Sequence, residues 1–349
     1  MRLTCLLLAL LISACAWTIT PTPPPAWPTA IRTTTTDGWN LALYRFAPRH
    51  PEKAGAPLIL IPDLFENGRV YDLDPEHSLA RRLAAAGRNV VIAELRGQGG
   101  SEKPAWWNQR RADWSFDAYV QYDLPAIVET IRASAAGDRV ILAGHGLGGT
   151  AGLAFMQARP EQVSGFIGFG VAARFCQLND LHRVLLAKLD QTKDLEAIPT
   201  SQGAKAPAPF IGADQSLFDI LLCNGRNWRR EIVESYYTAA LEPVSINVAR
   251  QIGDWMRNGT FASADGQVNY LAGLRNITCP VLLISGALDN VFDPGCGREL
   301  LDRLGSADKT QRIFSETNGY LADYGHIGLL LAEHAGKEIG GYILHWLRR

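Results

Sequence analysis

Two side chains that could perform acid–base chemistry follow strand-like runs late in the chain. Asp289 comes just after the apolar run Val281–Gly286, and His326 lies in a glycine-containing segment before the last helix-like stretch. Open α/β sheets carry their ligands at the carboxyl ends of their strands, so a carboxylate at position 289 is well placed to orient a histidine. A histidine held in this way can act as a general base towards a nucleophile. Asp293 is the nearby alternative acid, although aspartates in such positions commonly form turns.

A tight turn earlier in the chain indicates where the nucleophile of such a site would lie. The β-branched run Val140–Ala143 leads into the glycine-rich segment Gly144–Gly149, and a helix-like stretch follows directly. This strand–turn–helix resembles the nucleophile elbow, G-x-(nucleophile)-x-G, of the lipase/esterase-like α/β-hydrolases, in which small flanking residues such as Gly144 and Gly148 let the turn pack tightly. The central position, which holds serine in that family, is Gly146 in this chain.

Other segments carry the same resemblance. Asp289 and His326 stand in the family's acid and base positions and in its chain order, and the segment around His326 is similar to the Gly-His segment of acid-lipase-type hydrolases. Glu94–Ser101 resembles the family's D-x-R-G-x-G-x-S turn, with Glu and Gln substituted. The segment 114–126 resembles the one that leads into its next helix. The resemblance implies an α/β-hydrolase fold with a helical cap insertion over the site.

The loop that would stabilise the oxyanion departs from the family as well. After Ile61 the family usually shows His-Gly, whereas this chain has Pro62-Asp63. The resemblance implies that the donors are the backbone N–H groups near Asp63 or Leu64 and that of Leu147, which no side-chain change removes. A carboxylate at Asp63 would oppose negative charge in this hole. The resemblance also implies that His145, next to the nucleophile position, packs beside the turn.

The missing serine leaves three functions open. Glycine adopts the left-handed conformation of the elbow freely, so the turn should form, but losing the nucleophile costs about a millionfold in turnover. The chain is then an impaired or inactive homologue that binds a small apolar or acyl-ester ligand under its cap. Alternatively, His326 and Asp289 activate a water in the space left at Gly146, or the domain is a non-catalytic interaction module of the cell envelope. The residues indicate no cofactor and no metal site.

Alternating strand-like and helix-like segments predict a mostly parallel sheet of about eight strands, covered by helices on both faces. From about residue 175 to 275 the alternation stops, and helix-like pieces near 181–186 and 230–234 stand among aromatic residues. We interpret residues 175–275 as the cap insertion, with a simple extra helical layer as the alternative. The core then consists of residues 31–174 and 276–349. Its predicted elements are a hairpin over 34–46, strands over 57–62, 89–94, 140–143, 166–171, 281–286 and 312–314, and helices over 78–86, 116–133 and near 343–347.

The first thirty residues read as a targeting segment. Residues 1–14 have a charged start, a short apolar run and small residues at the end, which is typical of a secretory signal peptide. Ile12–Cys15 resembles a bacterial lipobox in which Cys15 is lipidated; a plain signal peptide with an incidental cysteine is the alternative. Residues 15–30 then form a lipidated cysteine with a Pro/Thr-rich, extended tether. These features predict a lipid-anchored protein of the bacterial cell envelope, on the periplasmic face of the outer membrane in a two-membrane cell, because Ala16 follows the cysteine.

The net charge limits the classes of partner, and the cysteine content is considered for an exported protein. The formal net charge is −1 and no basic stripe stands out, which disfavours nucleic acid as a partner. Four cysteines remain beyond the leader, and an oxidising compartment allows them two disulfides. Proximity in the sequence predicts Cys176 with Cys223 and Cys279 with Cys296, while free buried cysteines are the alternative.

Overall fold

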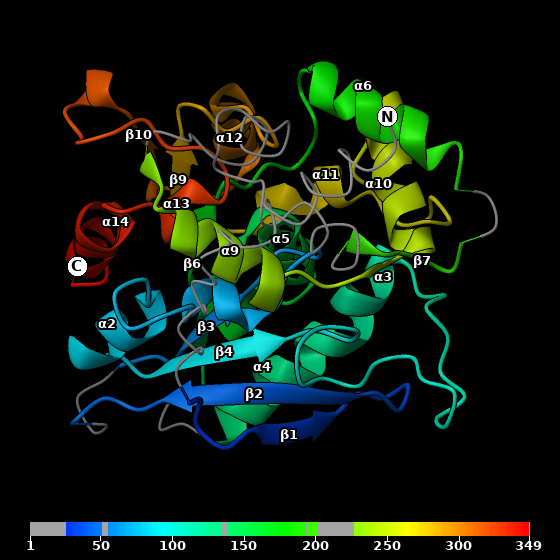
Figure 1. The fold of residues 1–349 in the computed structure, drawn as a ribbon, viewed down its shortest axis with the longest axis horizontal. Helices are drawn as coiled ribbons and strands as arrows, with labels where there is room; N and C mark the ends of the chain where they lie inside the picture. Colours follow the sequence, from blue (N-terminus) through cyan, green and yellow to red (C-terminus); the bar gives the residue numbers. More distant parts are fainter. Residues whose placement is uncertain (1–25, 51–54, 135–137, 193–194, 201–226, 349) are drawn as a thin grey trace, which may run out of the picture.

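A single eight-stranded sheet runs through the protein in the order β1-β2-β4-β3-β5-β6-β9-β10. The computed structural model describes residues 26–50, 55–134, 138–192, 195–200 and 227–348 (Figure 1). β2 pairs antiparallel with β1 and β4, and all other neighbours are parallel, which confirms the predicted sheet. The strands are β1 (Ile31–Thr34), β2 (Asn40–Phe46), β3 (Leu58–Ile61), β4 (Val90–Glu94), β5 (Val140–His145), β6 (Val163–Phe169), β9 (Val281–Gly286) and β10 (Lys309–Phe314).

Helices cover both faces of this sheet. Every residue of β3, β4 and β5 is buried, as expected for parallel strands that are covered on each side. Along β3, Ile59 and Ile61 belong to the apolar cluster that includes α4, α5 and α12, whereas Leu58 and Leu60 belong to the one that includes α2, α13 and α14. The core helices are α2 (Leu79–Ala85), α3 (Phe116–Ala118), α4 (Leu124–Ala133), α5 (Gly146–Ala158), α12 (Pro294–Arg303), α13 (Gly328–Leu331) and α14 (Ala335–Trp346), with 3₁₀ turns η2 (Gly68–Tyr71), η4 (Pro160–Gln162), η7 (Leu274–Asn276) and η8 (Glu316–Asn318).

The helix predicted over 116–133 is not continuous. A π-helical turn, η3 (Tyr119–Asp123), separates α3 from α4. Pro125, in the first turn of α4, has no N–H to donate to the carbonyl four residues earlier, so the regular ladder cannot pass through this point. The wider turn leaves the Asp123 carboxylate buried against the Arg96 guanidinium, at 2.7 Å.

The segment 175–275 contains helices that pack over the core. They are α6 (Asp180–Leu189), α9 (Arg230–Ala239), α10 (Ile246–Asn258) and α11 (Tyr270–Gly273), with a small ribbon of β7 (Ala197–Ile198) and β8 (Val244–Ser245). The helical pieces predicted at 181–186 and 230–234 fall within α6 and α9. The loop after β3 meets this insertion directly, because Asn67 N donates to Ala240 O at 2.8 Å and Glu66 bridges to Leu241. The insertion therefore reaches the carboxyl end of β3 (Figure 1).

The predicted cysteine pairing was wrong. Cys176 is bonded to Cys296, with the two Cα atoms 5.5 Å apart, and Cys279 is free and buried. Cys223 lies outside the described residues. Proximity in the sequence failed because the sheet reorders the chain: β6 and β9 are parallel neighbours, so the segments that follow their carboxyl ends meet. Cys176 and Cys296 lie in those two segments.

The described chain begins beside the outer strands. Trp27 packs against Tyr44, with ring centroids 4.3 Å apart, and lies under the guanidinium of Arg69. The predicted leader, Cys15 and most of the predicted tether lie outside the described residues. Among the described helices, none has both the length and the apolar character needed to cross a bilayer.

Candidate active site

The turn between β5 and α5 has the geometry of a nucleophile elbow. Its central residue, Gly146, has φ +50°, in the left-handed region that glycine enters without strain. A Cβ on Gly148 would lie 1.9 Å from the carbonyl oxygen of Pro62, so only glycine lets α5 approach the loop after β3 this closely. The predicted turn therefore forms, and it presents position 146 at the carboxyl edge of the sheet.

Asp289 and His326 meet at this edge. His326 Nδ1 lies 2.9 Å from Asp289 Oδ2, and Asp289 Oδ1 accepts the backbone N–H groups of Val291 and Phe292, each at 2.9 Å. The alternative acid, Asp293, instead caps α12, where its Oδ1 accepts from Gly295 N at 2.7 Å. A Cβ at Gly146 would be 3.0 Å from His326 Nε2. The structure thus brings residues 146, 289 and 326 together.

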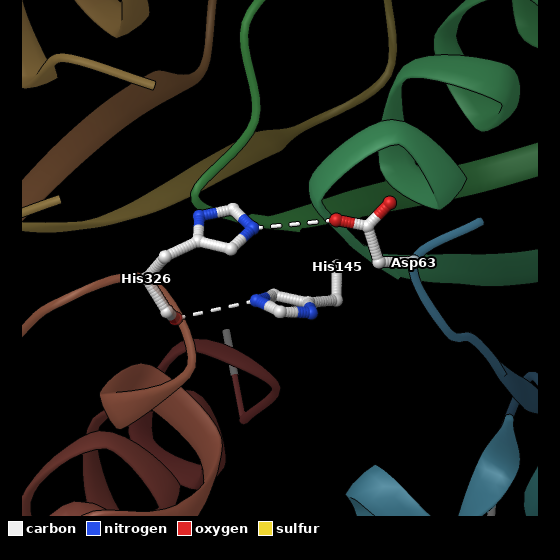
Figure 2. Close-up of side chains that lie close together, drawn as sticks. All are labelled: Asp63, His145 and His326. Atoms are coloured by element: carbon white, nitrogen blue, oxygen red, sulfur yellow. Dashed lines mark hydrogen bonds and ion pairs between the residues drawn. The ribbon is translucent and has the colours of Figure 1, made fainter. Parts of the chain in front are cut away.

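The carboxylate of Asp63 fills the space in which a side chain at position 146 would begin. A Cβ at Gly146 would lie only 2.0 Å from Asp63 Oδ2, and this oxygen is 3.3 Å from His326 Nε2 (Figure 2). Asp63 Oδ1 accepts the N–H groups of Leu64 at 2.6 Å and Leu147 at 3.2 Å. Of the predicted oxyanion donors Asp63, Leu64 and Leu147, the N–H groups of Leu64 and Leu147 are therefore both bound to the same oxygen of Asp63. The expectation that a water occupies the space at Gly146 does not agree with this placement.

His326 lies between two carboxylates and is almost completely buried, with 1% of its surface exposed. Burial lowers the pKa of its imidazole, but the charges and hydrogen bonds of Asp289 and Asp63 outweigh burial and raise this pKa to about 10. At neutral pH His326 is therefore an imidazolium that donates from both ring nitrogens. An imidazolium cannot accept a proton from a nucleophile before it has lost one itself.

His145 packs directly beside His326, as the resemblance implied. The two rings have centroids 4.4 Å apart and are tilted by 31°. His145 Nε2 donates to the carbonyl of His326 at 3.2 Å (Figure 2). Its Nδ1 contacts Glu66 Oε2 at 2.9 Å. Tyr236 from α9 donates to the other oxygen of Glu66 at 2.7 Å. Glu66 and Tyr236 were not predicted, because no sequence spacing links residues 66, 145 and 236.

The same cluster offers the donor atoms of a metal site but is already fully engaged. The ligand atoms of Asp63, His145 and His326 lie within 4.8 Å of one another. Both nitrogens of His145 are hydrogen-bonded, and His326 Nδ1 is bonded to Asp289. A metal ion would have to break these contacts, so the arrangement fits a hydrogen-bonded cluster better than a metal centre.

The turn that follows β4 holds the Asp63 loop in place. Gln98 Nε2 donates to Asp63 O at 2.8 Å, while Gln98 Oε1 accepts from Leu95 N at 2.9 Å. Glu94, which is buried, accepts from Gly68 N at 3.1 Å and from Gly100 N, and burial raises the pKa of its carboxyl group. The two substitutions relative to the family turn, Glu94 and Gln98, thus both contact the loop after β3.

The nearest hydroxyl does not substitute for a serine. Thr150 lies one helical turn beyond Gly146, and its Oγ1 donates to backbone carbonyls, at 3.2 Å from Gly146 O and 3.0 Å from Ala172 O. This hydroxyl is buried and contacts the segment that follows β6 rather than His326.

Comparisons with known proteins agree with this geometry. Residues 56–332 match the family described as alpha/beta hydrolase fold. The chain is 24% identical to triacylglycerol lipase 1 of Arabidopsis thaliana, over 90% of this chain and 85% of the lipase. It is 23% identical to the PhaC subunit of poly(3-hydroxyalkanoate) polymerase of Allochromatium vinosum, over 88% and 85%. A thermophilic esterase from Thermogutta terrifontis superposes with a TM-score of 0.62 at 16% identity, over 92% of this chain and 98% of the esterase. The match to the family model and the fold together show that the chain belongs to the α/β-hydrolase fold family. Within this family it resembles lipases and esterases.

Proposed function

We propose that this protein is a lipase/esterase-like member of the family that has lost serine-dependent ester hydrolysis. In this proposal it binds an apolar or acyl-bearing ligand beneath the 175–275 insertion, which acts as a cap, and a lipid on Cys15 holds it in the cell envelope. The observation that carries the proposal is the position of the Asp63 carboxylate, which lies where the serine would stand and binds both oxyanion donors.

Three features of the site support the absence of serine-dependent ester hydrolysis, and each affects a different step of that reaction. The attacking hydroxyl is missing, which alone costs about a millionfold in the subtilisin example. The N–H groups of Leu64 and Leu147 are occupied, and a single oxyanion donor is worth roughly 10²–10³ in turnover. His326 is protonated at neutral pH, so it cannot activate a hydroxyl or a water. The same geometry opposes the alternative in which His326 and Asp289 activate a water.

The expected ligand class follows from the likeness to lipases and from the insertion. The curated relatives include a triacylglycerol lipase and a poly(3-hydroxyalkanoate) polymerase subunit, whose names refer to acyl esters. In this chain α9 buries Ile232 and Tyr236, and Tyr236 donates to Glu66 in the loop after β3. An acyl chain is the ligand that an apolar pocket beneath the insertion would accept. The ligand's carbonyl would have to find other donors than Leu64 and Leu147.

Restoring the serine tests the proposal. Because a Cβ at 146 would contact Asp63 Oδ2 at 2.0 Å, we expect Gly146→Ser alone to give no esterase activity. Asp63→Ala alone frees the oxyanion donors but supplies no nucleophile. The double variant Gly146→Ser/Asp63→Ala should hydrolyse p-nitrophenyl esters at least a hundredfold faster than either single variant, with a preference for medium acyl chains over acetate.

Matched controls make the result specific. Gly146→Ala/Asp63→Ala has the same bulk at the elbow without a hydroxyl and should stay inactive, and adding His326→Ala to the double variant should abolish the gain. Vigorous hydrolysis by the unmodified chain would refute the loss of activity. A folded double variant without activity would show that the remaining machinery is not intact. Equal rates with acetate and longer esters would contradict an apolar ligand pocket.

A further inference from the structure

The loop between β4 and α3 presents two neighbouring tryptophans to solvent. Trp106 is 90% exposed and Trp107 is 70% exposed, which makes them the most exposed large apolar side chains of the described residues. Their ring centroids are 5.5 Å apart and the planes are nearly perpendicular, at 89°. Tryptophan side chains bury roughly 150–250 Å² each when covered, so this is a substantial apolar surface left open at one place. We call residues 103–111 the tryptophan loop.

Internal hydrogen bonds hold the tryptophan loop in its shape. Asn108 Oδ1 accepts from Ala105 N at 3.0 Å and from Arg110 N at 3.1 Å, and Asn108 Nδ2 donates to Lys103 O at 2.8 Å. Gln109 has φ +54°, the one positive φ among the described non-glycine residues. Strain of this kind persists only where the surroundings fix the backbone. The two indoles are therefore held outwards by an ordered turn.

The base of the loop is attached to the β1–β2 hairpin. Glu102 N donates to Asn40 O at 2.7 Å, and Arg110 Nε donates to Glu102 Oε1 at 3.0 Å. Arg110 also donates to the carbonyl of Gly38, at the hairpin turn. The loop consequently projects past the end of the hairpin, at the right of the view in Figure 1.

The composition of the tryptophan loop indicates that its partner is a membrane interface. Indole combines an apolar ring with an N–H donor, and tryptophan concentrates where hydrocarbon meets headgroups. Residues 103–111 carry three cations, Lys103, Arg110 and Arg111, and no acid of their own. Lys103 and Arg111 are paired with Glu242 and Glu196 of the insertion, and Arg110 is paired with Glu102 at the base of the loop. The Arg111–Glu196 pair is largely exposed, at 68% and 59%, so it is open to competition from anionic lipid. We propose that the tryptophan loop inserts its two indoles into the headgroup region of the membrane that holds the protein's lipid anchor.

The reach of the tether permits this contact. The inference rests on the proposed anchor at Cys15. From Ala26, where the described chain begins, to Thr34 beside the hairpin turn, the backbone spans at most about 30 Å. The predicted Pro-rich segment from Cys15 to Ala26 covers roughly 34 Å if it is extended. The extended tether is therefore about as long as the path to the hairpin turn, next to which the loop lies, and it raises the effective concentration of a contact that is weak alone.

Fluorescence quenching in vesicles tests the proposal. The full lipidated chain and its Trp106→Phe/Trp107→Phe variant are reconstituted in phosphatidylethanolamine/phosphatidylglycerol vesicles, with or without lipids brominated near the start of the acyl chain. The difference between the two emission spectra isolates the two indoles. We expect bromine to quench at least half of this difference emission. Emission that bromine leaves unchanged would overturn the proposal.

A matched control places the same fluorophore elsewhere on the surface. Leu321, which is 57% exposed and follows β10, is changed to Trp in the Trp106→Phe/Trp107→Phe background, and its emission should remain unquenched. Emission from the loop that varies with the protein-to-lipid ratio but not with bromine would identify a second copy of the chain as the partner, against the proposal. The mass of the N-terminal fragment reports the anchor separately: an unmodified Cys15 refutes the anchor and this inference with it. A modified Cys15 with unquenched indoles refutes the loop alone, and neither result bears on the esterase variants.

Discussion

At the scale of single residues, one aspartate decides what the site can do. The sequence identified Asp63 as a departure in the oxyanion loop, and the direction of its carboxylate was the open question. Backbone paths set that direction: the loop after β3 and the turn at Gly146 approach so closely that the carboxylate enters the space a serine would take. Asp63 binds His326 and the donors Leu64 and Leu147 at once, and no pattern within the sequence reveals contacts across 84 residues, to Leu147, and 263 residues, to His326.

Removing the charge of Asp63 should release His326. In Asp63→Asn the amide retains the shape and an acceptor for Leu64 and Leu147, but the negative charge beside His326 Nε2 is lost. We expect the pKa of His326 to fall from about 10 towards its ordinary value, as followed by the imidazole proton resonance across a pH titration. Asp293→Asn, which alters a helix cap outside this cluster, is the control and should leave the titration unchanged. An equal pKa in the two variants would contradict the ion pair.

The raised pKa of His326 also makes the free energy of unfolding depend on pH. A folded-state pKa above the ordinary 6.5 means that the stabilisation from His326 is complete below about pH 6.5 and is lost as the pH rises towards 10. The free energy of unfolding of the unmodified chain should thus decline across that window, and Asp63→Asn should flatten this decline.

At the scale of elements, the β5–α5 elbow is the part of the fold with the least freedom. Strands β3, β4, β5 and β9 were predictable because continuous apolar runs between turn residues have few other interpretations. The elbow was predictable because its glycines are required by close backbone contact. The π-helical turn within 116–133 was missed because hydrophobic spacing does not register one extra residue per turn, although Pro125 was a visible signal.

A methyl group at Gly148 should destabilise the protein. In Gly148→Ala the new Cβ would stand 1.9 Å from Pro62 O, so α5 and the loop after β3 must separate. We expect a loss of about 1–3 kcal/mol in the free energy of unfolding, measured by urea denaturation. Gly341→Ala in α14 is the counterpart: nothing lies within 4 Å of its Cβ, so the substitution should gain about 0.5–1 kcal/mol. Equal effects at the two positions would contradict the close approach of α5.

At the scale of the whole molecule, the order of the strands in space explains what the sequence could not predict. The meeting of Asp289, His326 and position 146 follows from strand ends that lie on one edge, and family resemblance anticipated it. The disulfide did not follow, because Cys176 and Cys296 become neighbours only once β6 and β9 are paired. The contact of Glu66 with Tyr236 likewise depends on the insertion's position over β3, and its contact with His145 depends on the pairing of β3 with β5.

Loss of that disulfide should weaken the attachment of the insertion to the core. The bond closes a loop of 120 residues, which restricts the unfolded chain. In Cys176→Ser/Cys296→Ser we expect the free energy of unfolding to fall by about 2–5 kcal/mol, measured under non-reducing conditions. Cys279→Ser removes a free buried thiol and serves as the comparison. A thermal midpoint that a reductant leaves unchanged in the native chain would show that this bond contributes little.

The glycine at position 146 also affects how the protein can be detected. Fluorophosphonate reagents report serine hydrolases by phosphonylating the hydroxyl at the elbow, and here that position offers only a Cα hydrogen beside the Asp63 carboxylate. Surveys that enrich labelled hydrolases will therefore pass over this chain even where it is abundant. Its expression has to be followed by antibody or by its peptides.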